Sequence, residues 1–182
     1  MRIFAALLML FLLWFPAPAQ DAKSAGKNEK LAPSFSVTSL EGKTFKLEDL
    51  KGKVVVLNFW FTTCPPCKEE IPKLNKIVEE NKNRDVVFLG LAMDNAQKIQ
   101  SFIKKNPFKY HLVPQGVQAL FGDYAEKEKN GSMEIPFPTH IVINQEGEIE
   151  MRVKGIKGVE ATRKTLDKLF GEDKKPAAEK TL

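Results

Sequence analysis

Two near-continuous apolar runs stand out in the middle of the chain, at residues 54–60 (VVVLNFW) and 86–92 (VVFLGLA). Both are rich in β-branched residues, which is typical of strands buried on both faces of a parallel or mixed sheet. Helical periodicity follows each run, over about 66–82 and about 95–106. This part of the chain therefore predicts the order strand, helix, strand, helix.

Two hairpins flank these elements. Residues 35–47 (FSVTSLEGKTFKL) contain two short strands around a Glu41-Gly42 turn. The segments THIVIN and EIEMRVKG flank Gln145-Glu146-Gly147 and predict a closing antiparallel hairpin. A final amphipathic helix over about 158–170 completes the order. Together the elements predict one three-layer α/β domain.

The two ends of the chain differ in composition from the middle. Residues 1–19 (MRIFAALLMLFLLWFPAPA) have one arginine, an apolar run too short to span a bilayer and a small-residue pattern before Gln20. This is the layout of a cleaved secretory signal peptide, with an uncleaved membrane anchor as the alternative. The remaining chain divides into an expected flexible linker, a folded domain and a disordered tail: 20–32, 33–171 and 172–182.

The charges describe a solvated surface. The 28 basic and 23 acidic residues give a formal net charge of +5, and they are interleaved instead of gathered into a basic stripe. Nucleic-acid binding normally needs clustered positive charge, so we expect no nucleic-acid partner. No large apolar stripe is left over once the core faces are assigned, which favours a monomer.

The only two cysteines, Cys64 and Cys67, lie directly after the first apolar run. As a structural disulfide this pair would stabilise the fold by roughly 2 kcal/mol, against nearly 5 for a loop of about 100 residues. A structural zinc site needs four ligands, and His111 and His140 lack finger-like spacing. Lys68 stands where covalent haem attachment requires histidine. A redox-active pair is the interpretation that these observations favour.

The position of the pair suits thiol chemistry. Pro65-Pro66 is well tolerated in a first helical turn, so Cys64 is expected at a helix N-terminus. The positive end of the helix dipole stabilises a thiolate, which is the attacking species in disulfide exchange. Cys67, one turn inside the helix, is placed to resolve the mixed disulfide.

Glu70 is the candidate proton carrier. On a helical wheel it falls inside the apolar arc, between Leu74 and Ile77, whereas Glu69 falls outside it. We therefore expect Glu70 to be at least partly buried near Cys67 and Glu69 to be solvated. A carboxyl with restricted solvation can exchange protons near neutral pH. The alternative is an ordinary exposed helix glutamate.

The segment LEDLKGKVVVLNFWFTTCPPCKEEIPKL resembles the active-site region of the TlpA/ResA-like thiol–disulfide oxidoreductases, and the resemblance covers about 32–170. It implies a thioredoxin-like fold, with a central mixed sheet, helices on both faces and an N-terminal hairpin extension. It also implies an exposed nucleophile at Cys64 and a buried resolving cysteine at Cys67. IPFPTHIVIN resembles the family's cis-proline segment, which puts the cis bond at Phe137-Pro138. The residues implied to bind partners are Trp60, Phe137, Pro138 and Thr139.

Some positions set this sequence apart within the superfamily. Asn58 replaces the aspartate of many thioredoxins, and the TlpA/ResA-like branch carries instead a glutamate at the position of Glu70. Thr63 stands where most relatives have tryptophan, a difference that bears on partner surface and redox potential. For His140 we expect packing or partial exposure instead of catalysis. Pro136 is interpreted as a rigid loop element, and His111 has no predicted role.

The resemblance implies an enzyme without a bound cofactor or metal. Its partners would be protein thiols and disulfides, such as apocytochromes awaiting haem in cytochrome c maturation, and a membrane thiol donor would recharge it. It would act in the periplasm or elsewhere outside the cytoplasm, as a reductant. The alternatives are an oxidant or isomerase, a non-enzymatic binding module, and a thiol peroxidase. Against the last, Leu57 and Phe61 stand where peroxiredoxins place proline and threonine.

Overall fold

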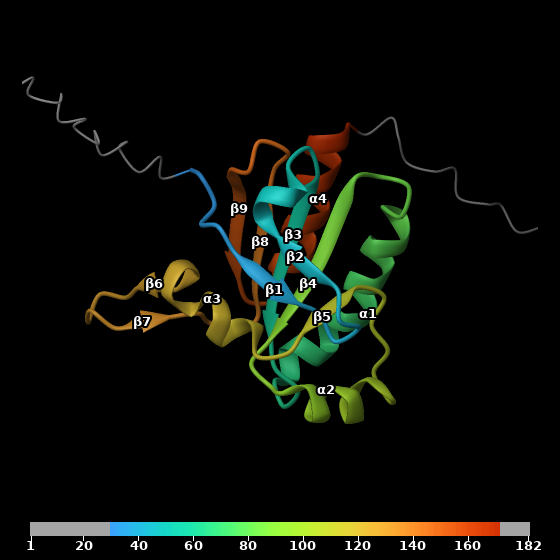
Figure 1. Cartoon of the computed structure of the whole chain (residues 1–182), viewed down its shortest axis with the longest axis vertical. Coiled ribbons are helices and arrows are strands. Elements are labelled where there is room, and N and C mark those ends of the chain that lie inside the picture. Colours follow the sequence, from blue (N-terminus) through green and yellow to red (C-terminus); the bar gives the residue numbers. More distant parts are fainter. Residues whose placement is uncertain (1–29, 172–182) are drawn as a thin grey trace, which may run out of the picture.

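A five-stranded mixed sheet forms the centre of the molecule in the computed structural model, which describes residues 30–171 (Figure 1). The strand order is β5-β4-β3-β8-β9. The strands are β3 (Val54–Trp60), β4 (Val86–Ala92), β5 (His111–Val113), β8 (Thr139–Ile143) and β9 (Ile149–Lys154). The first three are parallel, whereas β8 is antiparallel to both β3 and β9. The predicted signal peptide, most of the predicted linker and the predicted tail lie outside the described residues.

The central strand β3 explains the apolar run that it occupies. All seven of its residues are buried, because helices cover one face and other elements cover the opposite face. Both predicted strands, 54–60 and 86–92, are confirmed with the same bounds. The predicted closing hairpin is also confirmed, as β8 and β9.

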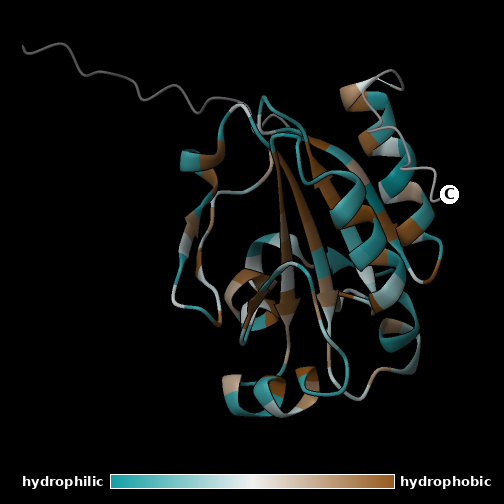
Figure 2. Ribbon diagram, turned by 90° about the vertical axis from the view of Figure 1, so that its right-hand side faces the viewer, coloured by the Kyte–Doolittle hydropathy of each residue, from teal (hydrophilic) through white to brown (hydrophobic). Residues whose placement is uncertain are grey.

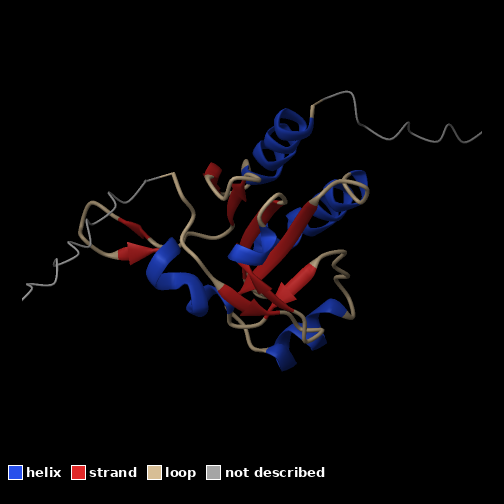
Figure 3. Ribbon diagram, turned by 45° about the horizontal axis from the view of Figure 1, so that its top comes forward, coloured by secondary structure: helices blue, strands red, loops and turns tan. Residues whose placement is uncertain are grey.

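Two helices, α1 (Pro65–Glu80) and α4 (Gly158–Phe170), pack on one face of the sheet (Figure 3). Leu74 and Ile77 from α1 and Leu166 from α4 lie against the even-numbered side chains of β3. The helix periodicity predicted both elements, and α4 has the predicted bounds. This face is the one onto which Asn58 of β3 and His140 of β8 also project, because side chains alternate along a strand.

The opposite face is covered by a hairpin and a helix. The hairpin consists of β1 (Ser36–Thr38) and β2 (Thr44–Lys46), as predicted, followed by the short helix η1 (Leu47–Leu50). The helix is α3 (Gly116–Tyr124). Buried side chains from this part of the chain pack on the odd-numbered residues of β3. The covering residues are Phe35, Val37, Phe45, Val117, Leu120 and Tyr124. Figure 2 shows the central strands mostly in brown, hydrophobic colours, whereas the helices carry both teal and brown residues.

The helix α2 (Ala96–Ile103) lies at the end of the sheet where β3 and β4 finish (Figure 1). Its buried residue, Ile99, packs with Trp60 and Leu112 in a cluster that also contains both cysteines. Within residues 30–171, no helix has the length and apolar character needed to cross a bilayer.

Five elements of the fold were not predicted. These are η1, β5, α3 and the two strands of a small hairpin, β6 (Glu126–Lys127) and β7 (Met133–Glu134). The small hairpin projects from the body of the molecule beside α3 (Figures 1 and 3). Lys154 of β9 anchors it, because its ammonium group lies 2.8 Å from Glu126 and 3.2 Å from Glu128.

The folded region begins earlier than the sequence suggested. Leu31 pairs with Glu148, and the Ala32 amide donates a hydrogen bond of 2.9 Å to the Gly147 carbonyl. Residues 30–32, which were expected to belong to the flexible linker, are instead hydrogen-bonded to the turn between β8 and β9. That part of the linker prediction is wrong, because backbone pairing is invisible in the composition of so short a segment.

Candidate active site

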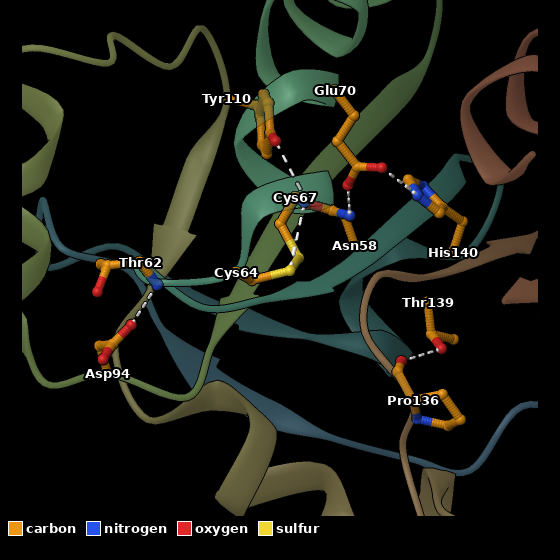
Figure 4. The surroundings of a disulfide bond; sticks show 10 residues. All are labelled: Asn58, Thr62, Cys64, Cys67, Glu70, Asp94, Tyr110, Pro136, Thr139 and His140. Carbon is orange, nitrogen blue, oxygen red and sulfur yellow. Dashed lines mark hydrogen bonds and ion pairs between the residues drawn. A yellow bond between two sulfur atoms is a disulfide. The ribbon is translucent and has the colours of Figure 1, made fainter. Parts of the chain in front are cut away.

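Cys64 and Cys67 form a disulfide at the point where β3 passes into α1 (Figure 4). Cys64 is the N-cap of α1, and its sulfur accepts a hydrogen bond of 3.3 Å from the Cys67 amide. Pro65 and Pro66 fill the first two helical positions, as predicted. The helix N-terminus therefore points at the Cys64 sulfur and stabilises negative charge there.

Both cysteines are buried in this oxidised form. Cys64 is 3% exposed and Cys67 is 1% exposed. The expectation of an exposed Cys64 is wrong for the disulfide state, because a cluster of aromatic and aliphatic side chains surrounds the pair. The sulfur atoms are thus held in an apolar setting, where an uncompensated charge is costly.

The carboxyl group of Glu70 is buried and held from two sides. Glu70 is 3% exposed, and Glu69 is exposed, as the helical wheel predicted. Asn58 donates a hydrogen bond of 2.9 Å from Nδ2 to Oε1 of Glu70. His140 Nε2 lies 3.1 Å from Oε2. Each carboxylate oxygen therefore has its own partner in the interior, and Figure 4 shows the group between these two side chains and near the disulfide.

Tyr110 fixes the orientation of Asn58. Its hydroxyl donates a hydrogen bond of 3.4 Å to Oδ1 of Asn58, which leaves the Asn58 amide hydrogens facing Glu70. Burial of the Tyr110 hydroxyl raises its pKa well above the ordinary value, and the Glu70 charge raises it further. The phenol therefore stays protonated and remains a donor at any physiological pH.

His140 is packed in the interior, which is one of the two settings expected for it. Its ring is completely buried and also lies at hydrogen-bonding distance from Glu70. Neither His140 nor Tyr110 was predicted to contact the site. The pairing of Asn58 with His140 across β3 and β8 brings the histidine there, and the sequence did not fix that register.

Trp60 lies beneath the cysteines. It is 1% exposed, and its ring packs 4.7 Å from the Phe108 ring and 5.6 Å from the Phe102 ring, measured between centroids. This placement does not support the predicted direct contact of Trp60 with a partner, because no substantial part of the side chain reaches the surface. The Trp60 ring instead packs in the buried cluster that contains both cysteines.

The predicted cis-proline segment lies beside the disulfide. The Phe137-Pro138 bond is cis, as the resemblance implied. Thr139 is buried and donates a hydrogen bond of 2.5 Å to the Pro136 carbonyl. Phe137 is half-buried, and its ring meets that of Phe61 edge to face at a centroid distance of 5.1 Å. Of the four residues predicted to bind partners, Phe137 has the most accessible side chain.

An apolar groove extends from Phe137 along α3. Its volume is about 380 Å³, and its lining residues are Met93, Val117, Gln118, Phe121, Ile135 and Phe137. Met93 and Phe121 are exposed, at 42% and 39%. Among residues 30–171 there is no group of three or more histidine, cysteine or acidic side chains arranged to hold a metal ion.

Asp94 holds the segment that leads into the cysteine pair. Its carboxylate accepts a hydrogen bond of 2.6 Å from the Thr62 amide and lies 2.5 Å from the Lys98 ammonium group. Burial acts to raise the pKa of Asp94, but the hydrogen bonds from Lys98 and Thr62 and the Lys98 charge outweigh it and lower the pKa overall. The carboxylate form therefore stabilises the folded state.

We expect Asp94→Asn to lower the free energy of unfolding by about 1–2 kcal/mol at pH 7, because a charged acceptor is lost from a backbone hydrogen bond. Since folding lowers the pKa of Asp94, its contribution is present above the unfolded value, about 3.9, and disappears as pH falls through the folded value. Urea unfolding at pH 7 and pH 3 measures both effects. The variant should lose less stability on acidification than the parent, and an equal loss would contradict this account. Asp85→Asn, which removes an exposed ion pair with Lys53, is the control and should have little effect.

The fold and the site together define a class. A cysteine pair at the start of the helix that follows the central strand, with a cis-proline beside it, is the arrangement of thioredoxin-fold dithiol proteins. The chain matches the AhpC/TSA family over residues 29–152, and it belongs to this family.

The similar proteins specify the activity. The chain is 33% identical over 139 residues to the thiol-disulfide oxidoreductase ResA of Bacillus cereus, covering 76% of this chain and 73% of that one. It is 28% identical over 148 residues to the sporulation thiol-disulfide oxidoreductase A of Bacillus subtilis, covering 79% and 82%.

Solved structures agree with this. A thioredoxin-family thiol:disulfide interchange protein from Chlorobium tepidum has a TM-score of 0.64 at 26% identity, covering 81% of this chain and all of that one. StoA from Bacillus subtilis has a TM-score of 0.59 at 25% identity, covering 74% and 97%. The protein is a ResA-like thiol–disulfide oxidoreductase with a thioredoxin-like fold.

Proposed function

We propose that the protein is exported and reduces disulfides of partner proteins through Cys64 and Cys67. The observation that carries the direction is the burial of the disulfide next to a buried carboxylate. Reduction would create a thiolate in an apolar setting close to Glu70, and like charges in a low-dielectric site repel each other strongly. The oxidised form of this protein is therefore favoured, so the reduced form gives electrons away readily.

The proposed cycle begins with the reduced protein. The Cys64 thiolate attacks one sulfur of the partner disulfide, forms a mixed disulfide and displaces the other partner sulfur as a thiolate. Glu70 accepts the thiol proton of Cys67, and the resulting Cys67 thiolate attacks the Cys64 sulfur. The second partner sulfur leaves, and the proton on Glu70 together with one from solvent protonates the two partner thiolates. The partner gains two electrons and two protons, and the protein gains a disulfide.

The surface around Phe137 is the proposed partner-binding region. It combines the half-buried Phe137 ring, the backbone of residues 137–139 and the apolar groove that runs to Phe121. An extended partner segment would lie across the cis-proline segment and place an apolar side chain in the groove. Thr63, which directly precedes Cys64, is exposed, and most members of the TlpA/ResA-like branch carry tryptophan at this position.

The apolar segment at residues 1–19 supports an extracytoplasmic location, where disulfides persist. Because such a protein is oxidised by each client that it reduces, a membrane thiol donor would have to restore its dithiol. Apocytochromes awaiting haem are the clients that the resemblance to the TlpA/ResA-like branch favours. We propose that it works as a monomer.

The reduction potential of the Cys64–Cys67 pair tests the direction. We expect a value near that of thioredoxin, about −270 mV, when the protein is equilibrated in a thiol/disulfide buffer series at pH 7. Cys67→Ser is the matched control, because it cannot form the internal disulfide. A value near that of DsbA, about −120 mV, would identify an oxidant and contradict the proposed direction.

A further inference from the structure

His140 is a buried histidine in close contact with a helix backbone. It lies on β8 directly opposite Asn58 of β3, and its ring is 0% exposed. Gly158, the first residue of α4, packs on the ring. A Cβ atom at position 158 would lie 2.0 Å from Cδ2 of His140, so only glycine fits there. The ring is therefore held between β3, α1 and the start of α4.

The surroundings select one protonation state of His140. Nε2 faces Oε2 of Glu70 at 3.1 Å, whereas Nδ1 is buried and has no hydrogen-bond partner among the described residues. A protonated imidazole would leave an N–H group unpaired in the interior, which is costly. The N-terminus of the 13-residue helix α4, at Gly158, also disfavours positive charge on the ring. Both effects favour a neutral ring with its hydrogen on Nε2.

A neutral His140 with its hydrogen on Nε2 is a donor to Glu70. Asn58 already donates to Oε1, so both oxygens of the carboxylate accept a hydrogen bond. Because the two contacts engage different oxygens, they restrict rotation of the carboxylate. The two donors also fix the plane of the carboxylate on the side of α1 that carries Cys67, one turn away.

We propose that His140 is a positioning residue for the proton transfer from Cys67. It holds the Glu70 carboxylate in place, so that this group is positioned to accept the thiol proton when the mixed disulfide is resolved. This inference rests on the proposed function, because it acts through Glu70. The titratable groups that face the pair are Tyr110 and Cys67, while β9 places Val153 opposite His140 and α4 places Gly158 against it.

The test separates the two sulfur steps. Reduced protein is mixed with one equivalent of 5,5′-dithiobis(2-nitrobenzoate) in a stopped-flow instrument between pH 5 and pH 9. The first thionitrobenzoate is released when Cys64 attacks, and the second when Cys67 resolves the mixed disulfide. The variants are His140→Leu, His140→Gln, Glu70→Gln and the double variant Glu70→Gln/His140→Leu. His111→Asn is the matched control, because His111 is half-buried and lies next to Glu41, away from Glu70.

We expect His140→Leu to slow the second phase about tenfold at pH 7, since a hydrogen bond to a charged group is lost. The first phase should change less than twofold. His140→Gln, which retains an N–H donor, should recover most of the rate. In the Glu70→Gln background, loss of His140 should have no further effect, because the proposed role passes through Glu70.

The other outcomes are distinct. If Glu70→Gln slows the second phase and His140→Leu does not, the role of His140 is overturned and the proposed function stands. If the His140→Leu defect is equally large in the Glu70→Gln background, His140 has only a structural role. If Glu70→Gln itself has no effect, the proposed proton carrier is wrong, whatever His140 does.

A measurement on the unmodified protein tests the inference even if His140→Leu does not fold. The chain has two histidines, so long-range ¹H–¹⁵N spectra assign both rings, with His111→Asn identifying the second. We expect His140 at pH 7 to be neutral, with the hydrogen on Nε2. A hydrogen on Nδ1, or a ring protonated at both nitrogens, would contradict the proposal.

Discussion

Cys67→Ser is expected to convert the protein into a trap that stays covalently attached to its partner through Cys64. Cys64 keeps its place at the N-terminus of α1, so the first attack proceeds. The serine hydroxyl is a far weaker nucleophile than a thiolate at neutral pH and cannot displace the partner. Turnover should fall by at least about a thousandfold, while the mixed disulfide accumulates stoichiometrically.

The trapped species is measured by intact mass after incubation with a disulfide-containing peptide, with and without reductant. Cys64→Ser is the matched control and should give no adduct, because the first attack is assigned to Cys64 at the N-terminus of α1. Adduct formation by Cys64→Ser together with its absence in Cys67→Ser would reverse the assigned roles.

Glu70→Gln is expected to slow resolution of the mixed disulfide about a hundredfold at pH 7, the low end of the range for general base catalysis. Glutamine keeps the size of the side chain but cannot accept the proton of Cys67. The deficit should shrink as pH rises past about 8.5, where a cysteine thiol ionises without help. The rate of the second thionitrobenzoate release from pH 5 to pH 9 measures this.

Glu69→Gln provides a matched control one residue away. Glu69 is exposed on the other side of α1, so its replacement should leave the pH profile unchanged. An identical effect of the two variants would show that the lost charge on α1, and not proton transfer, causes the change. A Glu70→Gln rate equal to that of the parent throughout the pH range would remove the proposed role of Glu70.

The parts of the site that lie on one helix could be predicted from the sequence. Cys64, Cys67 and Glu70 share α1, so the cysteine spacing and the helical wheel predict which of them face the interior. The long buried strands could be predicted equally well, because near-continuous apolar runs of seven residues leave few other interpretations. The resemblance supplied the cis-proline segment, which no composition or periodicity would have located.

The contacts between segments that are distant in the sequence could not be predicted. His140 reaches Glu70 because β8 pairs with β3 in a register that places His140 opposite Asn58. The local hydrophobic pattern does not determine strand order. Tyr110 and Asp94 act from loops, which carry no periodicity. The strands β5 and β6, of three and two residues, are too short for alternation to show, whereas the Glu41-Gly42 turn marked the equally short β1 and β2.

The burial of Cys64 shows the same limit. The burial of a cysteine at a helix N-terminus cannot be predicted from the residues next to it. The side chains that bury Cys64 come from β3, α2 and the cis-proline segment. The degree of burial nevertheless matters for the function. In the proposed function it is the property that, together with Glu70, favours the disulfide over the dithiol.

Electron transfer to a client-like disulfide tests the central claim most directly. The reduced protein is mixed at pH 7 with an equal amount of a peptide that has a disulfide within the haem-attachment motif Cys-X-X-Cys-His. Free thiols are then alkylated in acid-quenched samples, and both chains are weighed by mass spectrometry. We predict that the peptide acquires two alkyl groups and that the protein acquires none. A peptide that keeps its disulfide while the protein remains fully alkylated would contradict the account.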